Sequence, residues 1–129
     1  FGEYLDALGR MKRTVDVGTQ LAHHPLRVFV MGERALRREA ATPEDIARME
    51  ALATEAMRAG AFGITTSRTD QHMTRAGEQV PGRHADTEEL LGLARALRGV
   101  GRGALGLNAD FEDVDAEFDW MRAFARESG

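Results

Sequence analysis

The sequence predicts an α/β protein in which helices alternate with the strands of a small parallel sheet. A short apolar strand at residues 61–66 leads into a polar loop and then into an amphipathic helix, which is the order of a βα unit. Two further strand-like segments, at 15–21 and 103–107, also precede helical patterns. Polar residues crowd the carboxyl end of the 61–66 strand, where parallel α/β folds place their functional groups.

The first elements are short. Residues 3–9 predict a helix with Leu5 and Leu8 on one face. Residues 15–21 alternate between apolar and polar side chains, as a half-buried strand does. The apolar stretch 26–31 is compatible with either a strand or a buried helix.

A longer helix comes next. Thr42 suits its N-cap, Pro43 suits its first position, where the missing N–H is not needed, and Gly60 suits its end. The predicted buried stripe comprises Ile46, Met49, Ala53, Ala56 and Met57. The strand at 61–66 follows directly.

Two further helices flank the third strand. Asp86 and Glu89 have the spacing of a capping box, and the helix that they start ends before Gly99. Its predicted buried face comprises Leu90, Leu93, Ala94 and Leu97. The last helix has an acidic start and a basic end, which complements the helix dipole. Its charged residues are Asp113, Asp115, Arg122 and Arg126, and its apolar stripe is Val114, Phe118, Met121 and Phe124.

This order of elements implies parallel strands joined by right-handed crossovers. Three strands fall short of a complete TIM (β/α)8 barrel, which needs about 250 residues. A small three-layer domain and a slice of a barrel both fit the pattern. We favour the slice, a single partial domain over residues 1–129 with about three βα units, because both ends of the sequence look cut.

The composition argues against several classes of protein. The 129 residues are 43% hydrophobic and 29% charged, which is ordinary for a soluble globular domain. No apolar run has the roughly 18 residues of a membrane span, and the net charge of −4 argues against nucleic-acid binding. The absence of cysteine excludes disulfides and thiolate metal sites and favours a cytoplasmic protein.

Two adjacent histidines follow the first strand. His23 and His24 lie where neutral imidazoles bind metals or transfer protons. Neighbouring side chains in extended backbone point apart, however, so that both rings cannot easily reach one metal ion. We therefore favour a structural interpretation, in which one ring packs or bonds to backbone and the other faces water.

A long polar loop follows the 61–66 strand. Loops of this length in compact domains are often lids or binding loops. Within it, Arg68 could clamp a carboxylate and His72 could contact a ligand, although a solvated loop with a surface arginine fits equally well. His84 is expected at the start of the next helix. Carboxylates near the third strand suggest a hard-cation site or a stabilised helix start, and we prefer the helix start; they are Asp110, Glu112, Asp113 and Asp115.

Three segments together resemble one branch of the metal-dependent amidohydrolase superfamily, the deacylases of N-acyl-D-amino acids. They are residues 23–32, residues 59–68, and Val80-Pro81-Gly82 with the helix up to residue 97. The resemblance implies a TIM barrel with zinc at the carboxyl ends of its strands. In that family the metal polarises an amide carbonyl and activates the attacking water.

By position, the resemblance implies substrate-binding roles for His23, Arg68 and His72, and it assigns no catalytic residue or metal ligand within the chain. Asn108 falls at or near the position of a zinc-binding histidine in many members. Asparagine is a poor zinc ligand beside imidazole, which argues against a two-metal site built from this strand.

The sequence therefore predicts an internal fragment of a cytoplasmic hydrolase that cleaves an N-acyl amino acid or a related amide. The zinc ligands are expected mostly outside this chain, so the isolated fragment is expected to be inactive. Its expected partners are the N-acyl amino acid, the remainder of the barrel and a second copy of itself, with no nucleic acid and no membrane. The alternative is a non-catalytic α/β domain that binds a small anion or a partner protein.

Overall fold

The predicted alternation of strands and helices is present in the computed structural model, which describes residues 1–129. The elements are α1 (Gly2–Gly9), β1 (Leu21–Ala22), α2 (His23–Met31), α3 (Glu33–Leu36), α4 (Pro43–Ala59), β2 (Gly63–Arg68), α5 (Thr87–Val100), β3 (Ala104–Ala109) and α6 (Val114–Ser128). The apolar stretch at 26–31, which fitted either type of element, is helical. None of these helices is both long enough and apolar enough to span a membrane.

The strands form one parallel sheet in the order β1-β2-β3. β2 pairs with β3 along its whole length, whereas β1 contributes only Leu21 and Ala22, which pair with Ile64 and Thr65. The strand predicted at 15–21 is therefore wrong for all but its last residue. Val15 is 69% exposed, and an alternating pattern does not make a strand where no neighbouring strand supplies hydrogen bonds.

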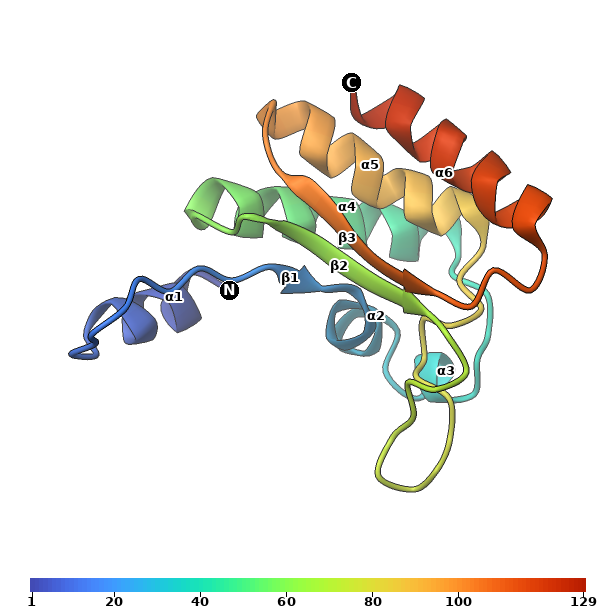
Figure 1. Ribbon diagram of the computed structural model, residues 1–129, viewed down its shortest axis with the longest axis horizontal. Coiled ribbons are helices and arrows are strands. Elements are labelled where there is room, and N and C mark those ends of the chain that lie inside the picture. The colour runs from blue at the N-terminus through green and yellow to red at the C-terminus, as the bar shows by residue number, and fades with distance from the viewer.

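Helices α4, α5 and α6 all lie on one face of the sheet, and the opposite face is left largely open (Figure 1). Paired residues of parallel strands point to the same side of a sheet. Ile64 is fully buried in the core, and its partner Leu105 packs against that core, so both face the helices. By alternation, Thr65 and Ser67 of β2 point to the open face.

The predicted start of α4 is confirmed, whereas the predicted end of α5 before Gly99 is wrong, because α5 continues to Val100 and Gly101 caps it in the left-handed conformation. The Thr42 side chain accepts a hydrogen bond from the Asp45 N–H, and the Asp45 carboxylate accepts one from the Thr42 N–H, which completes a capping box at the start of α4. The predicted stripe of α4 is also confirmed, since Met49 and Met57 are almost fully buried.

Two further predicted details are wrong. Asp86 caps α5, but the Glu89 side chain does not return to it and instead turns into the protein interior. In α6 the buried residues are Glu117, Trp120 and Phe124, whereas the predicted Phe118 is 44% exposed. Because α6 packs mainly against one neighbour, α5, its buried stripe is narrow and is rotated from the predicted one.

Candidate functional site

A groove of about 1100 Å³ lies on the open face of the sheet, toward the carboxyl ends of the strands. It is lined by Ala22, His24, Pro25, Val28, Phe29, Leu36, Thr65, Thr66, Ser67, His72, Thr74, Val80, Pro81, Gly106, Leu107 and Asn108. These residues come from β1, α2, α3, β2, the loop after β2, and β3. None of them is Asp, Glu, Lys or Arg, so that the groove is uncharged apart from its two histidines.

His24 is held in one protonation state. Its Nδ1 accepts a hydrogen bond from the Gly82 N–H at 3.1 Å, and its Nε2 has no partner. Burial, followed by the nearby His23 and His72, lowers the pKa of His24 to about 4. A neutral imidazole that accepts at Nδ1 carries its proton on Nε2. The expectation that one of the two rings faces water is therefore wrong, because His24 is only 8% exposed and His23 is fully buried.

The predicted residue His72 does reach the groove. It lies in the loop after β2 with an exposed side chain, and its ring is edge-on to that of His24 with 5.4 Å between centroids. The loop has internal order, because Met73 and Gln79 form an antiparallel bridge. His72 is thus presented by a folded loop at the edge of the groove.

His23 points to the opposite side of the sheet, among the helices. Its Nδ1 is 2.9 Å from Thr66 Oγ1, and its Nε2 is 2.8 Å from Glu89 Oε1. The same carboxylate oxygen accepts a hydrogen bond from Arg27 Nε at 2.8 Å. Burial opposes ionisation of Glu89, but His23 and Arg27 outweigh it and lower the pKa of the carboxyl group. This network ties α2, β2 and α5 together on the helix-covered side of the sheet.

Arg68 also faces the helices. Its Nε donates to both carboxylate oxygens of Glu117, at 2.9 and 3.1 Å, and its Nη1 donates to the Ala85 carbonyl at 3.0 Å. The guanidinium carbon lies 5.5 Å from the centre of the Trp120 ring. In this arrangement Arg68 and His23 are both committed to contacts within the protein and neither lines the groove. Their substrate-binding roles stay predictions.

The polar residues Ser67 and Asn108 were not identified from the sequence as neighbours in the groove. Ser67 is 7% exposed and its Oγ has no hydrogen-bond partner. It pairs in register with Asn108, which is exposed at the same edge. Only the alternation along β2 could have indicated that Ser67, rather than Arg68, faces the groove. Because β2 has a single large aliphatic residue, Ile64, that alternation is not readable from the sequence.

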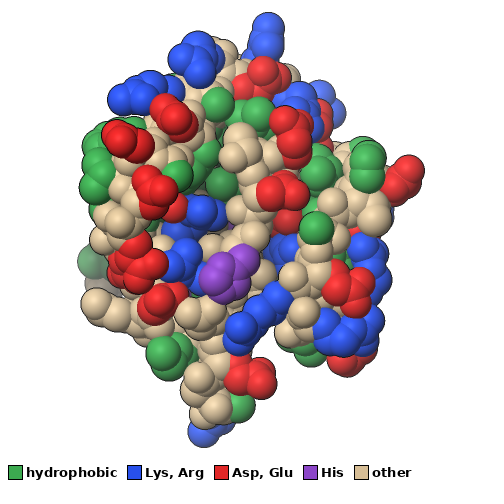
Figure 2. All heavy atoms as spheres, turned by 90° about the vertical axis from the view of Figure 1, so that its right-hand side faces the viewer, with side chains coloured by type: hydrophobic (Ala, Val, Ile, Leu, Met, Phe, Trp, Pro, Cys, Tyr) green, Lys and Arg blue, Asp and Glu red, His purple; other side chains and the backbone are tan.

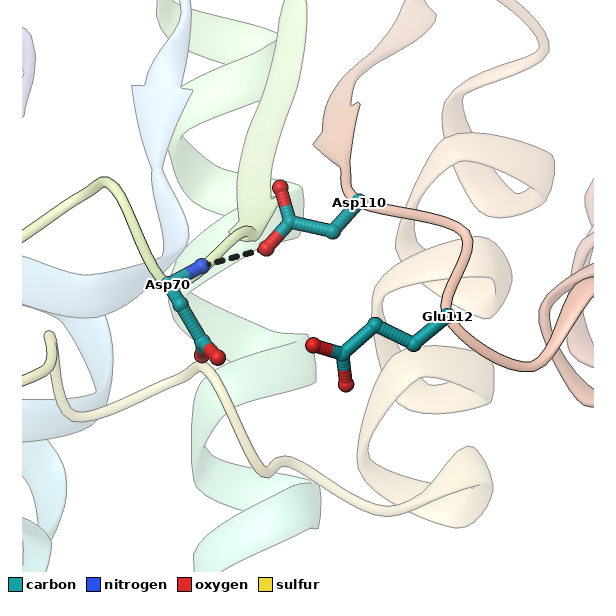
Figure 3. A group of neighbouring side chains, drawn as sticks. All are labelled: Asp70, Asp110 and Glu112. Carbon is teal, nitrogen blue, oxygen red and sulfur yellow. Dashed lines mark hydrogen bonds between the residues drawn. The ribbon is translucent and has the colours of Figure 1, made fainter.

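Three carboxylates gather beside the groove, with oxygens within 4.8 Å of one another (Figure 3); they are Asp70, Asp110 and Glu112. Asp110 accepts a hydrogen bond from the Asp70 N–H at 2.7 Å. Asp70 in turn accepts from Gln79 Nε2 and from Arg83 Nε, which lies 2.9 Å away. These contacts fasten the loop after β2 to the end of β3, and Arg83 supplies the positive charge.

The residues present do not make a zinc site by themselves. Both ring nitrogens of His23 have protein partners, and His24 carries a proton on its outer nitrogen. Asn108 lies at the edge of the groove where the resemblance placed a histidine. A zinc ion at this edge would need ligands from elsewhere.

Charges are mixed on the face at the right of Figure 1. Figure 2 shows acidic and basic side chains interspersed there, with no continuous basic patch. Some of the arginines of the chain are neutralised by ion pairs, such as that of Arg34 with Glu39 and Asp45. This face has none of the concentrated positive charge that nucleic-acid binding requires.

Comparison with curated proteins finds two relatives of this chain. The similarity covers 78% of the chain for one relative and 77% for the other. The chain is 39% identical over 101 residues to D-aminoacylase and 34% identical over 99 residues to N-acyl-D-aspartate deacylase, both from Alcaligenes xylosoxydans xylosoxydans. The resemblance drawn from the three sequence segments is thereby confirmed.

The chain spans 18% of the length of each of these two relatives. No protein-family model matches the chain. No solved structure matches it either.

Proposed function

We propose that this chain forms part of a hydrolase that cleaves the amide bond of N-acyl-D-amino acids. The observation that carries the proposal is the 39% identity to D-aminoacylase over most of the chain. The position of the groove agrees with it, because parallel α/β enzymes bind their substrates at the carboxyl ends of the strands.

The proposed architecture is a segment of a TIM barrel. Both outer strands, β1 and β3, have one unpaired edge, and one face of the sheet lacks a covering layer (Figure 1). Further strands would pair with those edges, and closure would cover the open face, as in a barrel. The much greater length of the two relatives supports this arrangement.

In this proposal the chain supplies part of the barrel wall and one substrate loop. His72 contacts the substrate from the loop after β2. Arg68 and His23 hold that loop and the β1–α2 junction in place, since their partners Ala85 and Glu89 lie on the next segment of the chain. Zinc is held mostly by residues outside residues 1–129, so this segment alone does not hydrolyse the amide.

The alternative of an anion-binding domain has less support. A small anion needs Lys, Arg or a set of free backbone N–H groups. No Lys or Arg lines the groove, and the nearest strand-end arginine, Arg68, is bound to Glu117.

The test compares the complete protein that contains this segment with residues 1–129 alone. Release of free amino acid is measured for N-acetyl-D-leucine and N-acetyl-L-leucine with zinc supplied. We expect D-selective release by the complete protein and none by the segment. His72→Ala should reduce the rate, whereas the matched change His84→Ala, at a histidine bound to Gln79 outside the groove, should not. Activity of the segment alone, or equal effects of both changes, would contradict the proposal.

A further inference from the structure

Two polar atoms in the groove lack hydrogen-bond partners although they are buried. They are Nε2 of His24 and Oγ of Ser67, on side chains that are 8% and 7% exposed. A buried polar group without a partner is unfavourable, and native proteins leave few of them. Two such atoms in one groove therefore point to a ligand that supplies the missing partner.

The proton on each atom has no acceptor within the protein. The Gly82 N–H occupies Nδ1 of His24, which leaves the ring proton on Nε2. The Ser67 hydroxyl carries its own proton and rotates to suit an acceptor. A ligand atom that pairs with either one is thus a hydrogen-bond acceptor, and His24 in this state does not offer Nε2 as a metal ligand.

The topology of the sheet brings the two residues into one groove. β1 ends at Ala22, and His24 lies in the first turn of α2, which follows directly. Ser67 lies near the end of the neighbouring strand β2 and pairs with Asn108 of β3 on its other side. Both donors therefore lie at the carboxyl end of the sheet, and both residues line the groove.

The rest of the groove favours an uncharged ligand with a hydrocarbon part. Its apolar lining includes Pro25, Val28, Phe29, Leu36 and Val80. Phe29 is 75% exposed and Leu36 is 53% exposed, so both have apolar surface available for contact. With no Lys or Arg in the lining, a buried carboxylate would lack a counter-charge. A neutral carbonyl oxygen needs none.

We propose that the groove is the acyl-group subsite, in which His24 and Ser67 donate hydrogen bonds to the carbonyl oxygen of the substrate and the apolar wall receives its hydrocarbon chain. This inference rests on the proposed function for the identity of the acyl group. It assigns His24 and Ser67 as substrate-positioning residues, and it makes acyl-chain length a determinant of binding.

The test measures by calorimetry how tightly the complete protein binds two probes of equal chain length. Hexanamide is neutral, and hexanoate carries a negative charge. His24→Asn keeps an acceptor for the Gly82 N–H but removes the outer donor, whereas His24→Gln restores a donor near the position of Nε2. We expect hexanamide to bind about tenfold more weakly to His24→Asn and to Ser67→Ala, which is the loss of about one neutral hydrogen bond. His24→Gln should recover part of the affinity, and hexanoate should bind poorly throughout.

The matched controls are His84→Asn and Ser128→Ala, which lie outside the groove. Equal hexanamide affinity in His24→Asn and wild type would overturn the inference, as would stronger binding of hexanoate than of hexanamide. ¹⁵N NMR of the histidine rings gives a second, independent check. A proton on Nδ1 of His24, or displacement of the Nε2 proton by zinc, would also overturn it.

The two proposals fail separately. If the protein releases no amino acid but binds hexanamide through His24 and Ser67, the deacylase proposal fails and the carbonyl site stands. If it is a D-selective deacylase whose KM is the same for acetyl and hexanoyl substrates in wild type and in both variants, the subsite inference fails alone.

Discussion

Glu89→Gln isolates the charge of one buried carboxylate. Glu89 Oε1 accepts from His23 and Arg27, whereas Oε2 has no partner, so an amide nitrogen at Oε2 breaks no hydrogen bond. The substitution then leaves the Arg27 guanidinium, only 2% exposed, without its counter-charge. Breaking a buried ion pair from one side destabilises by about 3–5 kcal/mol. Because the substitution keeps both hydrogen bonds, we expect the free energy of unfolding to fall by an amount near the lower end of this range, about 3 kcal/mol.

The chain offers a control with the same chemistry at the surface. Glu50 binds Arg95 at the same distance of 2.8 Å, but both side chains are about one-third exposed. Exposed pairs of this kind contribute about 0–1 kcal/mol. Glu50→Gln should therefore be nearly neutral, and the difference between the two variants measures the effect of burial.

Urea unfolding of the purified protein, followed by fluorescence of Trp120, gives the free energies. With a slope of about 1–3 kcal/mol per molar urea, Glu89→Gln should lower the midpoint by about 1–3 M. The pKa of Glu89 is lowered in the folded state. The ionised carboxylate therefore contributes to the free energy of unfolding above the unfolded-state pKa of about 4.3, and this contribution is lost as the pH falls through the folded-state pKa. The gap to wild type should therefore shrink in acid. A loss below about 1 kcal/mol at pH 7, or a gap that widens in acid, would refute the reasoning.

Three further changes follow from single contacts. Thr42→Ala removes the side-chain acceptor for the Asp45 N–H and should destabilise by about 1 kcal/mol in the same assay; Thr42→Ser, which keeps an acceptor, should not. Gly63→Ala places a Cβ against the Ala104 carbonyl and should destabilise by about 1–3 kcal/mol or more by disturbing the β2–β3 pairing; an unchanged midpoint would contradict that register. His24 has its pKa lowered from 6.5 to about 4, so the folded state should lose up to about 3 kcal/mol as the pH falls between these values. His24→Asn should flatten that dependence.

Elements specified by neighbouring residues were predictable. The N-cap at Thr42 and the stripe that includes Met49 and Met57 depend on residues within one helix, and both are confirmed. The parallel order of the sheet followed from the alternation of strands and helices, and it too is confirmed.

Features decided by distant contacts were not predictable. Asp86 and Glu89 have the spacing of a capping box, but the partners that attract the Glu89 side chain, His23 and Arg27, are more than 60 residues away in sequence. The direction of the Arg68 side chain depends on which alternate residues of β2 face the helices. The residues of β2 are mostly small and polar, so the sequence does not reveal this. Phe118 was expected to be buried but is exposed, because its burial depends on which face of α6 packs against α5.

The same limit applies to the candidate site. The sequence located its region, the loop after β2 and the β1–α2 junction, and His72 does line the groove. It did not distinguish His24 from His23. Which ring faces the groove is decided where β1 passes into α2, and the outcome is visible only in the contacts with Gly82 and Thr66.

The most direct test of the central claim is an assay of the complete protein, purified without added metal, on N-acyl-D- and N-acyl-L-amino acids together with its zinc content. We expect D-selective release of the amino acid with about one zinc per chain, because Asn108 is a poor ligand for a second ion. Two zinc ions per chain would mean that the ligand near Asn108 has been misplaced. If neither enantiomer is hydrolysed after zinc is restored, the proposed deacylase function is wrong.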